Sequence, residues 1–106
     1  MAAMFVNGFN TDELSNGIDD FGMSPNNPIP CETILGSVIY LENLRTLNGD
    51  KVLNERIGSF KSDITPYPVD GYQIYNLNRQ KITVLYFSPY QKRNSRKAPR
   101  GFKLTE

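Results

Sequence analysis

Tyr72–Tyr90 reads Tyr-Gln-Ile-Tyr-Asn-Leu-Asn-Arg-Gln-Lys-Ile-Thr-Val-Leu-Tyr-Phe-Ser-Pro-Tyr, and we expect this stretch to anchor the fold. Two runs rich in β-branched and aromatic residues flank a short polar gap, a pattern typical of a β-hairpin. Along the second run, apolar side chains alternate onto both faces, so we expect this strand to be covered on both sides. Pro89 has no amide proton for a neighbouring strand, so regular pairing is predicted to stop near Ser88. We interpret the aromatic residues as core packing.

The secondary structure of Cys31–Thr46 is harder to predict. Its helical spacing is carried by Ile34, Leu35, Val38, Leu41 and Arg45. We therefore expect helical turns near residues 33–43 with Thr33 as a cap, although residues 38–41 also fit a buried strand and periodicity alone does not separate the two. Asn48-Gly49 favours a type I′ turn, which predicts pairing of Leu44–Leu47 with Lys51–Ile57. Near the end of the chain, Phe102 and Leu104 are expected to fold back as an edge strand or tether.

Residues 1–30 are predicted to form an acidic N-terminal arm, and residues 31–106 an α+β body. In the arm, Leu14, Ile18 and Phe21 have helical spacing and Gly22 suits a helix end, which predicts a short helix. Three prolines in residues 24–30 predict an extended linker. The apolar side of the arm helix is expected to pack on the body; docking on a partner is the alternative.

A chain of 106 residues has the size of a single domain. We predict a small α+β domain with an antiparallel sheet of about four to five strands and one or two short helices. No apolar run is long enough for a transmembrane helix, so no membrane association is expected. The single cysteine, Cys31, excludes an internal disulfide and favours a cytoplasmic location.

The chain contains no histidine, which removes the usual Ser-His-Asp and Cys-His catalytic sites. Its glycines are scattered, without the spacing of a phosphate-binding loop. Cys31 has no evident activating base, and no cofactor or metal site is expected. A small enzyme built on carboxylates is a weaker alternative, with Glu32, Glu55, Asp63 and Asp70 as the candidate acids. No combination of motifs resembles a characterised family.

Charge is distributed unevenly along the chain. Residues 1–44 contain six acidic and no basic residues, whereas residues 45–106 contain all 12 basic residues and five acidic ones. The predicted binding residues for a polyanion or partner are Tyr90, Lys92, Arg93, Arg96, Lys97, Arg100 and Lys103.

Two functions suit this distribution of charge. The leading hypothesis is a non-enzymatic interaction module that binds a protein partner through an aromatic and charged surface. The alternative is binding of RNA or single-stranded DNA, in which basic residues neutralise phosphates and aromatic rings stack on bases. A further interpretation assigns no ligand to the basic segment, which is then solvated or neutralised by the acidic arm.

Overall fold

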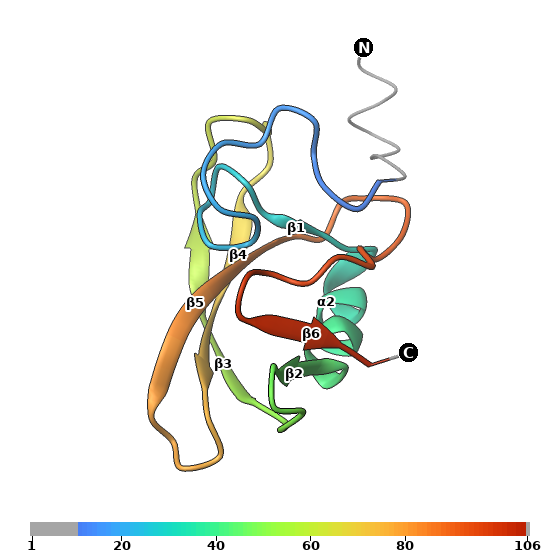
Figure 1. Ribbon diagram of the computed structural model, residues 1–106. Helices are drawn as coiled ribbons and strands as arrows, with labels where there is room; N and C mark the ends of the chain where they lie inside the picture. The colour runs from blue at the N-terminus through green and yellow to red at the C-terminus, as the bar shows by residue number, and fades with distance from the viewer. Residues whose placement is uncertain (1–10, 106) are drawn as a thin grey trace.

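The computed structural model describes residues 11–105, which form an α+β domain of one helix and six strands (Figure 1). Four strands make the main sheet, in the order β1-β5-β4-β3. β5 (Lys81–Ser88) and β4 (Val69–Tyr75) are the predicted hairpin, and β3 (Leu53–Phe60) continues the antiparallel pattern. β1 (Ile29–Pro30) pairs with β5 in parallel. The predicted fold class is confirmed, with one short parallel strand added to the antiparallel sheet.

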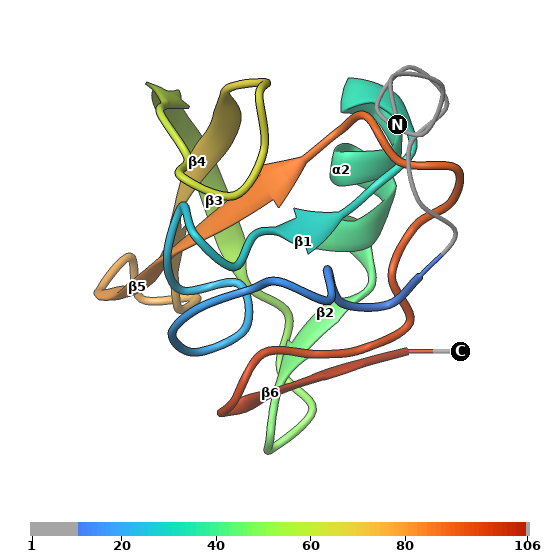
Figure 2. The same cartoon turned by 90° about the horizontal axis from the view of Figure 1, so that it is seen from above.

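The helix and a second, two-stranded sheet complete the domain. α2 (Thr33–Glu42) leads directly into β2 (Leu44–Thr46), which pairs with β6 (Phe102–Leu104) in antiparallel fashion. Phe102 and Leu104 therefore fold back as a strand, as predicted. Seen from above, β1 leads into α2 at one end of the main sheet, whereas β2 and β6 lie on another side of the molecule (Figure 2). In the described part of the chain, no helix is long and apolar enough to span a membrane.

The core lies where the hairpin meets α2. Phe87 of β5 is fully buried, and its ring makes edge-on contacts with Tyr40 of α2 and Tyr72 of β4, at centroid distances of 5.4 and 5.3 Å. Such edge-on aromatic pairs add stability beyond the area that they bury. The core packing predicted for the aromatic residues of the hairpin is confirmed for Tyr72 and Phe87, whereas it was wrong for Tyr90, which is 39% exposed.

The hairpin ends as predicted but is not covered along its whole length. β5 stops at Ser88, and the turn is closed by a hydrogen bond from the Asn76 N–H to the Gln80 carbonyl oxygen. Ile82 remains 43% exposed, so the expectation that both faces of this strand are covered was wrong at its start. The reason is visible in Figure 1, where the tip of the hairpin projects beyond the rest of the domain.

The predicted helix in the arm does not form; residues 11–22 make a series of turns instead. Asp19 has a φ of 76°, which lies outside the right-handed helical region. The Asn27 side chain donates hydrogen bonds to the Asp19 carbonyl oxygen and to the Glu13 carboxylate, both at 2.9 Å. The Ile18 N–H donates to the Asn26 carbonyl. These bonds to the segment that follows replace the local bonds of a helix.

The proline-rich residues 24–30 are packed into the domain. Pro28, Ile29 and Pro30 are fully buried, and the pairing of Ile29 with Phe87 makes β1 part of the main sheet. The segment predicted to be a linker thus supplies a strand. Residues 1–10 of the predicted arm lie outside the described residues.

Asn48-Gly49 lies in a turn, but not in the predicted hairpin. Gly49 has a φ of 91°, whereas Asn48 is not among the described residues with positive φ, and a type I′ turn needs both. Across this turn the strands share one isolated bridge, between Arg45 and Lys51. β2 then pairs with β6, and β3 with β4, so the predicted pairing of Leu44–Leu47 with Lys51–Ile57 is confirmed only at this bridge and was wrong for the rest of both segments.

Candidate functional site

α2 turns its most hydrophobic side outward. The helix predicted near residues 33–43 is confirmed, and it packs on the body through Gly36, Ser37, Tyr40 and Leu41. The opposite side carries four apolar residues that are between 44% and 67% exposed: Ile34, Leu35, Val38 and Ile39. We call these four residues the α2 surface. An amphipathic helix normally buries such residues, so this orientation needs a cause.

Burial of Tyr40 and Leu41 orients the helix, and Asn94 fixes this orientation at the start of α2. The Asn94 Oδ1 accepts a hydrogen bond from the Glu32 N–H at 3.0 Å, and its Nδ2 donates to the Gly36 carbonyl oxygen at 2.8 Å. Asn94 can approach this closely only because Gly36 lacks a side chain: a Cβ there would lie 2.5 Å from the Asn94 Oδ1. We call this pair of hydrogen bonds the Asn94 clamp.

Tyr40 fixes the same side of the helix one turn later. Its hydroxyl donates a 2.7 Å hydrogen bond to the Lys97 carbonyl oxygen, and burial raises the pKa of the phenol. Thr33 makes the predicted capping contact, because its Oγ1 accepts a 3.4 Å hydrogen bond from the Gly36 N–H, whereas Glu32, which precedes the helix, makes no side-chain capping bond. The contacts from Asn94 and Lys97 therefore hold α2 with the α2 surface toward water.

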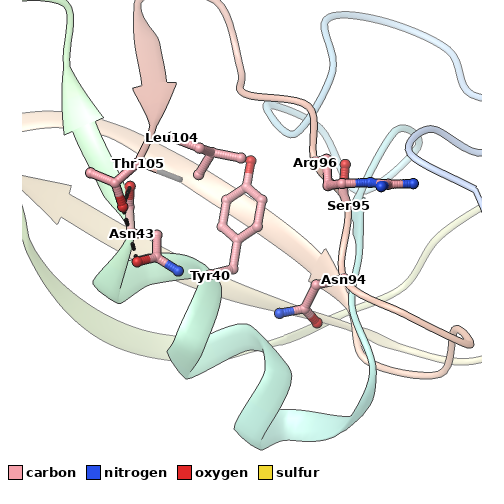
Figure 3. A pocket seen from close by; sticks show the side chains of 7 residues that line it. All are labelled: Tyr40, Asn43, Asn94, Ser95, Arg96, Leu104 and Thr105. Atoms are coloured by element: carbon pink, nitrogen blue, oxygen red, sulfur yellow. Dashed lines mark hydrogen bonds between the residues drawn. The ribbon is translucent and has the colours of Figure 1, made fainter.

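A cavity of about 430 Å³ lies between the end of α2 and the end of the chain. Figure 3 shows the Tyr40 ring standing between α2 and Leu104, with Asn43 and Thr105 joined by hydrogen bonds on one side. Most of the polar side chains in its wall are thus bonded within the protein, and no catalytic set of acid, base and nucleophile is formed. A smaller hollow on the other side of Asn94 includes Leu35, Ile39 and Arg93.

The acidic arm lies on the basic segment. Asp12 accepts a 2.7 Å hydrogen bond from the Arg93 guanidinium and another, at 2.8 Å, from the Arg96 backbone N–H. These bonds lower the pKa of the Asp12 carboxyl. Glu13 pairs with Lys97, which together with Asn27 lowers the pKa of Glu13.

A third pair, between Asp20 and Arg100, extends this neutralisation along the arm. The arm also contributes to the core, since Leu14 and Phe21 are buried and the Lys97 ammonium lies 4.9 Å from the centre of the Phe21 ring. The acidic arm is therefore a packed part of the domain and the direct counter-charge of the basic segment.

The remaining predicted binding residues do not join this group. Tyr90 packs its ring on Tyr67 at a centroid distance of 4.8 Å, in the loop before β4. Lys103 lies in β6 and is exposed, as is Lys92 near the start of α2. The structure thus brings together Arg93, Arg96 and Lys97 but does not unite all seven residues in one surface.

The candidate carboxylates are also separate. Asp70 pairs with Arg56 at 3.0 Å, and Glu55 accepts a hydrogen bond from the Tyr75 hydroxyl. Asp63 contacts the arm, and Glu32 lies at the start of α2. Among residues 11–105, no three acidic or cysteine side chains are grouped as a metal site would require.

Cys31 is fully buried, and burial raises the pKa of its thiol to about 12. A thiol with this pKa is almost entirely protonated near neutral pH, so it is a poor nucleophile.

No protein family, curated protein or solved structure matches this sequence.

Sequence reasoning found the helix but missed the α2 surface. The apolar residues at 34, 35, 38 and 39 mark one side of a helix, and that pattern is the same whether the side is buried or exposed. Gly36 was the available signal, because a glycine within a helix often marks a close approach by another group.

Proposed function

We propose that this chain is a non-enzymatic interaction module that binds a protein partner through the α2 surface. The observation that carries the proposal is the exposure of four neighbouring apolar side chains, Ile34, Leu35, Val38 and Ile39, on one helix. Single exposed apolar residues are ordinary, whereas a contiguous apolar patch with polar surroundings marks an interaction site. A helix face of this kind suits another apolar protein surface.

The ion pairs of the arm are the reason to prefer a protein over a nucleic acid. Arg93, Lys97 and Arg100 each have an acidic partner within the chain. Phosphates would have to displace these carboxylates, and affinity for nucleic acid comes largely from releasing mobile counterions, not from breaking internal ion pairs. An apolar helix face contributes nothing to phosphate binding.

The test is affinity capture with the whole chain and two matched variants. Leu35→Glu places a charge in the α2 surface, where Leu35 is 67% exposed, so folding should be little affected. Ile82→Glu changes an exposed apolar residue on the hairpin and is the control. We expect a saturable protein partner that is retained by the wild type and Ile82→Glu and lost by Leu35→Glu.

Equal capture by all three chains would refute the α2 surface as the binding site. Retention of RNA or single-stranded DNA by the wild type, weakening steeply with salt, would favour the nucleic-acid alternative instead.

A further inference from the structure

We propose that the protein bound at the α2 surface is a second copy of this chain, with the two α2 helices packed antiparallel about a two-fold axis. This inference rests on the proposed function, because it names the occupant of the same surface. It is argued from the symmetry of the surface, from the charges at its two ends and from the free outer side of α2.

The apolar residues are arranged so that the surface can match itself. When two identical helices cross antiparallel near the middle of α2, Ile34 of one copy lies at the level of Ile39 of the other. Leu35 lies at the level of Val38 in the same arrangement. All four side chains of each copy then meet an apolar side chain, as a two-fold interface requires.

The same register brings opposite charges together. Glu42 is the last residue of α2 and is exposed. In this register it lies at the level of residue 31 of the other copy, just before the start of that copy's α2. Lys92 lies next to residue 31 of its own chain, because the backbone N–H of its neighbour Gln91 donates a 3.0 Å hydrogen bond to the Cys31 carbonyl oxygen. Lys92 belongs to none of the ion pairs of the described residues.

Two other charged groups lie at the start of α2. Arg93 is already paired with Asp12. Glu32 occupies the cap position, where the positive end of the helix dipole favours a carboxylate. Lys92 is therefore the group best placed to meet Glu42 of the other copy.

The ends of the helix support the same orientation. α2 has no acidic residue in its first turn and no basic residue in its last turn. Outside these turns, Glu32 precedes the helix and the Arg45 guanidinium donates a 2.8 Å hydrogen bond to the Glu42 carbonyl oxygen, whereas the Glu42 side chain adds a negative charge to the negative end. Antiparallel packing places the positive start of each helix near the negative end of the other, which is favourable.

Space for the second copy is available in the described part of the chain. α2 lies at one side of the molecule, and no described strand covers its outer face (Figure 1). A helix of ten residues is about 15 Å long, so the contact is small. Small interfaces give weak, reversible complexes, and we expect a dimer that forms at high micromolar concentration.

The first experiment is sedimentation equilibrium of the full chain, from about 1 µM to 1 mM, a range that brackets weak association. We expect the apparent mass to rise from 12.0 kDa toward twice that value with concentration. Leu35→Glu should raise the dissociation constant by at least about tenfold, because the dimer contains the substitution twice. The control Ile82→Glu should dimerise like the wild type.

The second experiment tests the antiparallel arrangement with charge-reversed chains. Glu42→Lys alone would place two lysines together at each end of the dimer, and Lys92→Glu alone would place two glutamates together. A mixture of the two variants restores a Lys-Glu pair at both ends. We therefore expect each variant to dimerise a few-fold more weakly than the wild type and the mixture to form mainly the heterodimer.

Three results would overturn the inference: a monomer throughout the range, a dimer unaffected by Leu35→Glu, or no preference for the heterodimer in the mixture. A monomer whose capture of another protein still depends on Leu35 would refute the second copy but not the α2 surface. If neither capture nor self-association depends on Leu35, the proposed function fails as well.

Discussion

Replacing Gly36 with alanine sets two effects of opposite sign against each other. Gly36 lies within α2, and alanine in a helix is favoured over glycine by about 0.8–1.0 kcal/mol. The new Cβ, however, would lie 2.5 Å from the Asn94 Oδ1, closer than nonbonded atoms approach. Asn94 would have to withdraw, and both hydrogen bonds of the Asn94 clamp would weaken or break.

The two effects can be compared in magnitude. A hydrogen bond of this kind contributes about 1 kcal/mol, so losing the clamp costs about 2 kcal/mol. After the gain in helix propensity is subtracted, Gly36→Ala should lower the free energy of unfolding by about 1 kcal/mol. For a domain of this size, that corresponds to a fall in melting temperature of about 4–8 °C.

The assay is urea unfolding of four chains: the wild type, Gly36→Ala, Asn94→Ala and the double variant. In the Asn94→Ala background the alanine at position 36 no longer meets Oδ1. There it should stabilise the chain by roughly 0.8–1.0 kcal/mol, so the sign of its effect reverses. If Gly36→Ala stabilises the wild type, or has the same effect in both backgrounds, the Asn94 clamp does not hold α2 as described.

Three further outcomes are expected. The free energy of unfolding should fall as the pH drops below about 4.5. The reason is that the folded-state pKa values of Asp12 and Glu13 lie below their ordinary values of 3.8 and 4.5. Stabilisation from such groups is complete above the ordinary pKa and is lost as the carboxylates are protonated. Asp12→Asn with Glu13→Gln should flatten this dependence, and an unchanged acid transition would contradict the assignment. Tyr40→Phe should destabilise the chain by about 1 kcal/mol in urea, since the Lys97 carbonyl loses its donor; no loss would mean that water replaces the hydroxyl at no cost. Cys31 should react with a disulfide reagent at pH 8 far more slowly in the folded chain than in urea, because it is buried and its pKa is raised to about 12; equal rates would show that the site opens readily.

The hairpin could be predicted because its signal is local. Alternating apolar residues in Tyr72–Phe87 and a polar gap specify two adjacent strands without reference to the rest of the chain. The turns of the arm could not be predicted in this way. Leu14, Ile18 and Phe21 have the spacing of a helix, but the bond from Asn27 to the Asp19 carbonyl comes from the segment that follows. The spacing of apolar residues within one segment carries no information about a hydrogen-bond donor that lies in another segment.

The candidate site was predicted in part for the same reason. One alternative paired the basic segment with the acidic arm, and this is the arrangement of Arg93, Lys97 and Arg100. Which side of α2 faces water depends on contacts with distant segments, among them Asn94, which follows Gly36 by 58 residues in the sequence. Periodicity could therefore predict the helix, but not the exposure of Leu35.

The arm, the basic segment and α2 are linked by a continuous series of hydrogen bonds. Asp12 binds Arg93 and the backbone of Arg96, the two residues on either side of Asn94 and Ser95, and the Ser95 hydroxyl donates to the Asp12 carbonyl oxygen at 2.6 Å. The residue that clamps α2 is thus held by the arm. The charged residues predicted to bind a partner are thus bonded to the arm on either side of the residue that contacts the start of α2.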